Sequence, residues 1–174
     1  MNQLLLNAEV DFAFVDEFAM DKKIKTIPVY DETLELCSSL ELVEKFGRKR
    51  TETEEYYESL DYVDFSKDEQ ILRRWFKHHF GTDTQRLTLK ATVEDSQGIA
   101  RLVRASVGAG VLASHYIKRI EREGMKVHVF KGKKESLKNA ISIATLKDRT
   151  QSRSSHAALE FILKELADLK KRSN

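Results

Sequence analysis

The chain has 174 residues, which suits one compact domain or two small lobes of one unit and allows a substantial buried core. Its apolar fraction of 41% is ordinary for a soluble globular protein and argues against a disordered chain. The 30 basic and 28 acidic residues nearly balance, whereas a nucleic-acid-binding domain usually shows a strong basic excess. The short basic runs at 48–50 and 131–134 therefore favour solvated loops over phosphate contacts.

Cys37 is the single cysteine, so no disulfide can form within the chain and a reducing compartment is favoured. It lies in the apolar run 34–37, where a small buried side chain is a better interpretation than a catalytic thiol. No apolar run approaches the roughly 20 residues of a membrane span. No basic segment precedes an apolar stretch near the N-terminus, so a secretory signal is not supported. We expect a cytoplasmic protein without a membrane partner.

The N-terminal part predicts a short helix that leads directly into a strand. Residues 1–6 read as helix and 7–9 as its end, and residues 10–15 are rich in the branched and aromatic side chains of strands. Residues 25–36 read as extended chain, and Pro28 places the start of that segment at an edge or an entry.

A second helix is predicted from the capping-box spacing of Ser38 and Glu41. It would run through Phe46 and stop at Gly47. Residues 48–58 are highly charged, which predicts a loop.

The next segment predicts a strand at residues 62–65, followed by a helix that ends at Gly81. Ser66 and Glu69 repeat the capping-box spacing at the start of that helix. Its apolar face has helical spacing and consists of Ile71, Leu72, Trp75, Phe76 and His79. For Trp75 and Phe76, core packing is favoured over base stacking.

Residues 87–93 alternate between apolar and polar side chains, which predicts a half-buried strand. Asp95 or Ser96 then caps a helix. One face of that helix carries Ile99, Leu102, Val103 and Ser106. The helix breaks at 108–110.

The C-terminal part continues the alternation of strands and helices. We expect strands at 111–113, 127–130 and 140–146, and a helix capped by Ser114 and ended by Gly124. The last helix begins at about Ser154, and its predicted buried side consists of Ala158, Phe161, Ile162, Leu166 and Leu169. The whole pattern predicts an α/β fold with a mainly parallel or mixed sheet.

Motifs of known chemistry are absent from the sequence: there is no phosphate-binding loop, dinucleotide fingerprint, nucleophile elbow or zinc-protease helix. The five histidines do not show metal-ligand spacing, so we expect neither a metal nor a cofactor. The glycine pair at 108–110 favours a helix terminator over backbone approach to a ligand. The favoured interpretation of Asp95 and Ser66 is that both are plain helix caps, although a helix start facing a cleft also offers free N–H groups to an anion.

Three segments, taken in order, resemble one family. Residues 7–15, NAEVDFAFV, resemble the turn that enters its "DLAIV" strand, and residues 99–112, IARLVRASVGAGVL, resemble its "LVAAGLGIALLP" signature. Residues 149–166, RTQSRSSHAALEFILKEL, resemble its closing helix. The family is the LysR-type transcriptional regulators, and the resembling part is their effector-binding (substrate-binding) domain.

The resemblance implies a two-lobe fold like that of type 2 periplasmic binding proteins. Lobe one would hold residues 1–32 and 141–174, and lobe two would be the insert 33–140. A small-molecule effector, often an organic acid or a related metabolite, would bind in the cleft between the lobes. Lobe movement would then alter a homodimer or higher homo-oligomer, and through it the DNA-binding domains. The implied role is regulatory and not enzymatic.

The resemblance also implies a set of cleft residues. They are Asp16, Glu17, Ser66, Lys67, Asp95, Gly108, Gly110 and Val111. Lys67 is the one basic member, and with the N–H groups of the helix start it suits an acidic ligand. Asp16, Glu17 and Asp95 oppose a strongly anionic ligand, so the charge of the effector stays open.

The sequence departs from the family pattern in two places. Residues 112–114, Leu-Ala-Ser, replace the usual "LP", and no helix-turn-helix domain precedes residue 1. The opening strand, helix and second strand of lobe one also have no counterpart. We therefore expect an N-terminally truncated regulator, either a fragment or a short relative, that does not bind DNA by itself. An enzyme on the same architecture and a pure self-association domain using an exposed sheet edge remain as alternatives.

Overall fold

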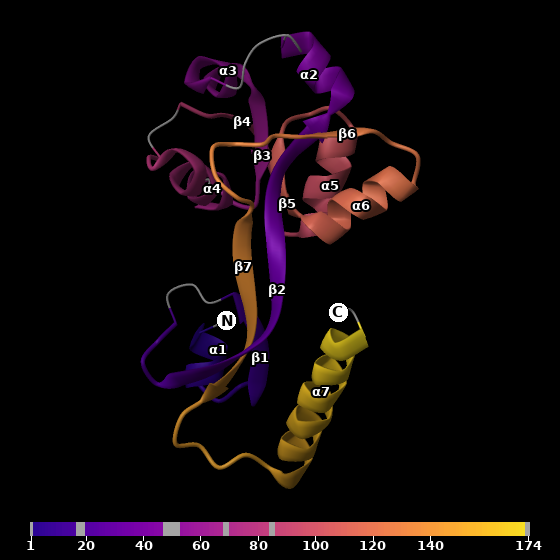
Figure 1. Cartoon of the computed structure of the whole chain (residues 1–174). Helices are drawn as coiled ribbons and strands as arrows, with labels where there is room; N and C mark the ends of the chain where they lie inside the picture. The colour runs from indigo at the N-terminus through magenta and orange to yellow at the C-terminus, as the bar shows by residue number, and fades with distance from the viewer. Residues whose placement is uncertain (1, 17–19, 47–52, 68–69, 84–85, 173–174) are drawn as a thin grey trace. The chain divides into compact units, whose positions relative to one another are not determined.

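A computed structural model describes residues 2–16, 20–46, 53–67, 70–83 and 86–172 (Figure 1). The chain divides into two compact units. Unit 1 comprises Met1–Glu32 and Lys138–Asn174, and unit 2 comprises Thr33–Leu137. The boundaries fall within the long strand β2 (Ile24–Ser39) and at the first residue of strand β7 (Leu137–Leu146).

The elements alternate along the chain, which confirms the predicted α/β class. The helices are α1 (Asn2–Leu6), α2 (Leu40–Phe46), α3 (Glu54–Ser59), α4 (Gln70–Phe80), α5 (Ser96–Arg104), α6 (Ser114–Arg122) and α7 (Arg153–Arg172). The other strands are β1 (Phe12–Asp16), β3 (Asp61–Asp64), β4 (Thr88–Thr92), β5 (Gly110–Ala113) and β6 (Val127–Val129). No helix in the described ranges has the length and hydropathy needed to cross a membrane.

Two sheets result from these strands. One has the strand order β1-β7-β2-β5, with β6 also paired to β2. Its β1–β7, β2–β5 and β2–β6 pairs are antiparallel. The other sheet pairs β3 with β4 in parallel. The strands are thus of mixed direction, one of the two arrangements predicted.

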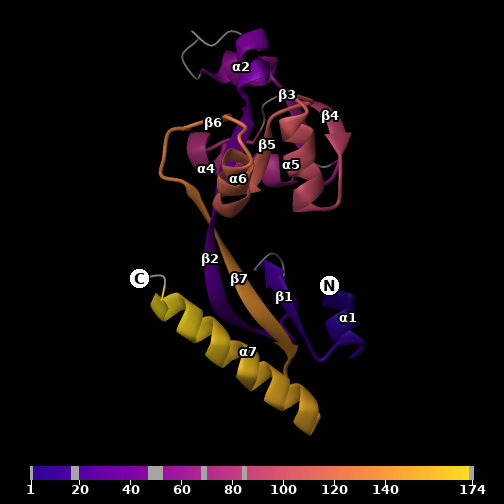
Figure 2. The ribbon, with the colours of Figure 1, turned by 90° about the vertical axis from the view of Figure 1, so that its right-hand side faces the viewer.

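Unit 1 has a small core between α1 and β1, which lie side by side in Figures 1 and 2. Leu5 of α1 packs with Ala13 and Val15 of β1 in this core. Between them, Phe14 points to the other face of the strand and is half exposed, at 50%. The predicted strand is confirmed, and its alternation shows that one face of the strand is covered.

The predicted buried side of α7 is wrong for unit 1. Phe161 is 65% exposed, Ala158 is exposed, and Ile162 and Leu166 are only half-buried. The side chain of Leu169 lies outside the described residues. The apolar clusters found in the described residues contain no α7 residue, so this helix face adds nothing to the core of unit 1.

Unit 2 contains an aromatic core around α4. Tyr57, Trp75, Phe76 and Phe130 are almost completely buried. The rings of Tyr57 and Phe76 meet edge to face, with centroids 5.5 Å apart. This geometry suits aromatic quadrupoles. The predicted core role of Trp75 and Phe76 is confirmed.

The predicted loop at 48–58 is wrong over its second half. Residues 54–59 form α3, and Thr53 caps that helix by accepting a hydrogen bond from the Tyr56 backbone N–H at 3.3 Å. Tyr56 and Tyr57 are buried, so the helix has an apolar face that its glutamates mask in the sequence. Residues 48–52 lie outside the described residues.

The start of α2 differs from the predicted capping box by one residue. The Leu42 backbone N–H donates to Ser39 Oγ at 3.1 Å, so Ser39 is the capping side chain and not Ser38. The Ser38 hydroxyl is buried and donates to the Ser39 carbonyl. Glu41 accepts a hydrogen bond from Ser106 Oγ at 3.0 Å. Strand β2 extends to Ser39, which shifts the helix start by one position.

The predicted cap at Ser114 is wrong by one residue, whereas the predicted helix ends at Gly81 and Gly124 are confirmed. Ser114 is the first residue of α6, and the cap position belongs to Ala113, whose side chain has no hydroxyl to donate or accept. Gly81 and Gly124 follow α4 and α6 with left-handed φ angles of 79° and 88°. Glycine adopts such angles without a steric cost, which explains why glycine follows both helices. Gly47 lies outside the described residues.

Candidate functional site

The carboxyl ends of β3 and β4 form one edge of the small parallel sheet in unit 2. The Val93 backbone N–H donates to the Asp64 carbonyl at 3.1 Å, which continues the pairing beyond both strands. Because parallel strands end at the same edge, the segments that follow them lie near each other. The structure therefore brings Ser66 and Lys67 to the same edge as Asp95.

Asp64 fixes the turn that carries Ser66 and Lys67. Its carboxylate is buried, with Oδ1 accepting from the Phe65 backbone N–H at 2.7 Å and Oδ2 from the Leu72 backbone N–H at 3.4 Å. Ser66 is half-buried and Lys67 is exposed. Sequence reasoning missed Asp64, although an aspartate at the end of a strand before a helix is a capping residue type.

Asp95 is the N-cap of α5, as predicted. Its carboxylate accepts a hydrogen bond from the Gly98 backbone N–H at 2.8 Å through Oδ1. A Cβ at Gly98 would lie 2.9 Å from Val93 Cγ2, so the first turn of α5 packs closely on the end of β4. The Asp95 charge compensates the positive end of the helix dipole, and the start of α5 is therefore a poor site for an anion.

Gly108, Gly110 and Val111 are buried in unit 2. A Cβ at Gly108 would lie 2.7 Å from the Tyr62 carbonyl carbon, and one at Gly110 would lie 2.9 Å from Ile99 Cγ2. These close approaches let the chain before β5 pack on β3 and α5. Packing within the unit accounts for both glycines, and a ligand contact at these positions stays a prediction.

Asp16 belongs to unit 1, at the end of β1. Asp16 Oδ1 accepts a hydrogen bond from Asn139 Nδ2 at 2.8 Å, and Glu32 Oε1 accepts another at the same distance. Asn139 is buried, at 4% exposure. Glu17 lies outside the described residues. Sequence reasoning did not single out Asn139 or Glu32.

Cys37 is fully buried, and its thiol donates to the Gly110 carbonyl with a sulfur–oxygen distance of 3.6 Å. Burial, followed by the charge of Glu35, raises the pKa of this thiol to about 12. The thiolate is the nucleophilic form. The thiol is therefore a core group, which confirms the sequence interpretation.

Comparison with known proteins identifies the fold. The sequence profile of the LysR substrate binding domain matches residues 1–167. The regulatory domain of CrgA, a LysR-type transcriptional regulator from Neisseria meningitidis, is similar with a TM-score of 0.70 and 15% identity, over 94% of this chain and 78% of that one. The effector binding domain of QuiR in complex with shikimate is similar with a TM-score of 0.70 and 18% identity, over 95% of this chain and 76% of that one.

A full-length regulator shows the same likeness. LysG from Corynebacterium glutamicum with bound effector Arg gives a TM-score of 0.69 and 13% identity, and the match covers 95% of this chain and 54% of that one. The comparison with curated protein sequences gives no match. These likenesses confirm the predicted periplasmic-binding-protein-like α/β fold. By the profile match over nearly its whole length, the chain belongs to the LysR substrate binding domain family.

Proposed function

We propose that this chain is the ligand-sensing regulatory domain of a LysR-type transcriptional regulator, and that it binds a small-molecule effector without turning it over. Family membership over residues 1–167 carries the proposal. Two structurally similar proteins are described with shikimate and with arginine bound. The buried thiol of Cys37, with its raised pKa, offers no nucleophile.

The effector-contacting edge that we propose in unit 2 is formed by Ser66, Lys67 and Asp95. Lys67 is exposed after β3, and its ammonium group can pair with a carboxylate. Asp95 is also exposed and uses only Oδ1 on the helix, so its second oxygen can accept a hydrogen bond from a ligand. This pair of charges suits an acid that also carries hydroxyl or amino groups, a class that includes both shikimate and arginine.

Several predictions from the resemblance belong to the same proposal. Unit 1 and unit 2 would serve as the two lobes, and Asp16, Glu17, Gly108, Gly110 and Val111 would complete the effector contacts. We propose a cytoplasmic homodimer or higher homo-oligomer. In such an assembly, a second copy of the chain would cover the 65% exposed side chain of Phe161 on α7.

We propose that a separate helix-turn-helix domain contacts the DNA. The similar full-length CbnR is described in complex with its target DNA. The net charge of +2 gives the present 174 residues little of the electrostatic attraction that DNA binding needs.

A thermal-shift screen of the full chain with amino acids and hydroxy acids tests the proposal. A ligand at a hundred times its Kd stabilises the folded state by about 2.7 kcal/mol, which raises Tm by several degrees in a protein of this size. Failure of every acid in a broad panel to raise Tm would contradict the proposal, as would catalytic turnover of any of them.

A further inference from the structure

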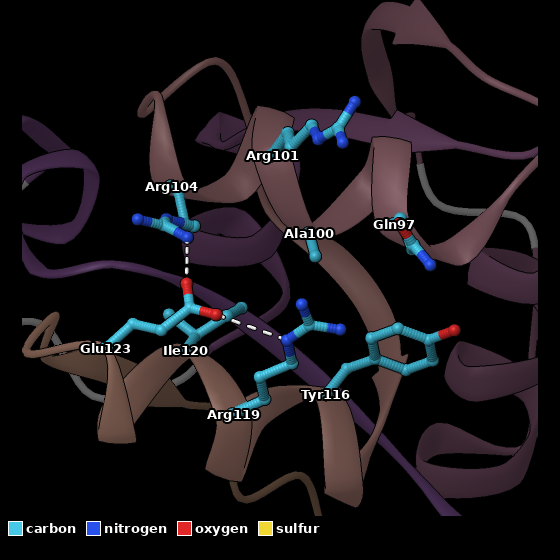
Figure 3. A pocket seen from close by; sticks show the side chains of 8 residues that line it. All are labelled: Gln97, Ala100, Arg101, Arg104, Tyr116, Arg119, Ile120 and Glu123. Carbon is cyan, nitrogen blue, oxygen red and sulfur yellow. Dashed lines mark hydrogen bonds and ion pairs between the residues drawn. The ribbon is translucent and has the colours of Figure 1, made fainter.

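A groove between α5 and α6 in unit 2 lies outside the effector edge proposed above. Its volume is about 200 Å³. Figure 3 shows its side chains: Gln97, Arg101 and Arg104 come from α5, and Tyr116, Arg119 and Glu123 come from α6 and its C-cap. It uses neither Ser66 nor Lys67 nor Asp95.

The groove concentrates positive charge. Three arginines and one glutamate line it, a net charge of +2, which equals the net charge of the entire chain. Glu123 forms ion pairs with both Arg104 and Arg119. One carboxylate therefore serves two guanidinium groups, and the lining favours an additional anion.

Arg119 is oriented for such an anion. Its Nε donates to Glu123 Oε1 at 3.2 Å, four residues along the helix. The two terminal amino groups of Arg119 form no hydrogen bond within the described ranges, and Figure 3 shows the guanidinium directed into the gap between the helices. A guanidinium edge of this kind binds a carboxylate through two parallel N–H···O bonds.

The groove also offers an apolar base and an aromatic wall. Ala100 and Ile120 are 8% and 3% exposed, so their methyl groups close the base. The half-buried ring of Tyr116 stands at one side, next to Arg119. A flat apolar group can pack on this combination, and the Gln97 amide, at the rim, can donate to the same ligand.

We propose that the α5–α6 groove is a second ligand site, which binds a small monocarboxylate with a flat apolar body. The carboxylate pairs with the terminal amino groups of Arg119. The apolar body lies on Ala100 and Ile120 beside Tyr116. This site does not depend on the proposed effector edge, and either one can fail without the other.

Isothermal titration calorimetry of phenylacetate into the full chain tests this site. We expect Arg119→Gln to weaken phenylacetate binding about tenfold or more, because it removes a charged hydrogen-bonding partner. Arg119→Lys keeps the charge but lacks the two parallel N–H donors, so its loss of phenylacetate affinity should be intermediate. Arg122→Gln is the matched control, an exposed arginine of α6 outside the groove, and should bind as the parent does. Phenylacetamide, the neutral analogue, should not bind.

Three results would overturn the proposal. Equal losses of phenylacetate affinity in Arg119→Gln and Arg122→Gln would show unspecific charge attraction. A loss of affinity in Lys67→Gln, with unchanged affinity in Arg119→Gln, would place phenylacetate at the proposed effector edge. Absence of phenylacetate binding to the parent would contradict the site, and a changed sedimentation coefficient in Arg119→Gln would then make the groove a protein–protein contact. Circular dichroism confirms folding, and the side chain of Arg119 is 67% exposed, so its replacement leaves the core intact.

Discussion

Asn139 and Asp16 are joined by a hydrogen bond of 2.8 Å, although 123 residues separate them in the sequence. The same amide nitrogen donates a second bond to Glu32. The buried amide of Asn139 in β7 thus links the carboxylate at the end of β1 with that of Glu32 in β2, and it compensates part of their mutual repulsion.

We expect Asn139→Asp to destabilise unit 1, because it replaces the shared donor with a third carboxylate. The loss at pH 7 should reach about 1–3 kcal/mol, the range for a buried polar group left without its partner. Urea unfolding of the parent and of Asn139→Asp at pH 7 measures it, and equal stability of the two proteins would contradict the account.

The capping bond of Asp95 gives a second prediction. Asp95→Ala should lower the free energy of unfolding by about 1 kcal/mol, because the Gly98 N–H loses its acceptor. Asp95→Asn should retain most of the stability, since asparagine is also a good N-cap. Glu94→Ala, an exposed neighbour, is the control. An equal effect of the Asp95→Ala and Glu94→Ala changes in urea unfolding would argue against the cap.

Two glycines should respond to alanine for different reasons. Gly108→Ala forces a methyl group to 2.7 Å from the Tyr62 backbone, and overpacking of this kind costs about 1–3 kcal/mol or more. Gly124→Ala meets no atom within 4 Å, and only its left-handed φ costs energy, about 1–2 kcal/mol. Gly124→Asn should therefore be better tolerated than Gly124→Ala, whereas Gly108→Asn should be worse than Gly108→Ala. Thermal unfolding of the four variants gives the order, and the reverse order would be inconsistent with this packing.

The buried thiol of Cys37 should be unreactive in the native chain. Its pKa is raised from an ordinary 9.0 to about 12, so the thiolate is scarce at pH 8 and reagents cannot reach it. Because the folded-state pKa is the higher one, this thiol contributes stability below pH 9 that is lost as the pH rises from 9 to 12. Labelling with a thiol reagent at pH 8 should require denaturant, and rapid labelling of the native chain would refute the buried position.

The exposed face of α7 gives a prediction in which stability stays nearly unchanged. Phe161→Ser should change the free energy of unfolding by no more than about 0.5 kcal/mol, since the side chain is 65% exposed. If α7 mediates self-association, the same change should shift the chain toward the monomer in light scattering. A loss of several kcal/mol in the monomer would show that Phe161 packs within the chain.

Local patterns predicted the elements that position the proposed effector edge. The strands at 62–65 and 87–93, the helix that ends at Gly81 and the cap at Asp95 all follow from periodicity and capping chemistry within a few residues. Each signal is local, so the sequence alone could carry it.

Short or shifted elements were harder to predict. Helix α3 spans six residues, too few for a periodic signal, and its glutamates resemble a solvated loop. At α2 the register moved from Ser38 to Ser39 because β2 continues to that residue. Two adjacent serines cannot be distinguished without the length of the preceding strand.

Contacts between distant residues could not be predicted from spacing. The two acceptors of the Asn139 amide, Asp16 and Glu32, lie on other strands than Asn139. The groove lining of α5 and α6 depends on how two helices pack. The helical spacing of α7 predicted an apolar stripe correctly. It could not show that Ala158 and Phe161 of this stripe stay exposed, since burial depends on the neighbouring elements.

We propose that this domain senses an acid that also carries hydroxyl or amino groups, through Lys67 and Asp95. The most direct test is calorimetric titration of the best stabilising acid from the thermal-shift screen into the parent, Lys67→Gln and Lys118→Gln, where Lys118 is an exposed lysine of α6. The account predicts that Lys67→Gln weakens binding about tenfold or more, the effect of losing one charged hydrogen bond, and that Lys118→Gln binds as the parent does. Equal affinity of all three proteins, or no binding by the parent, would contradict it.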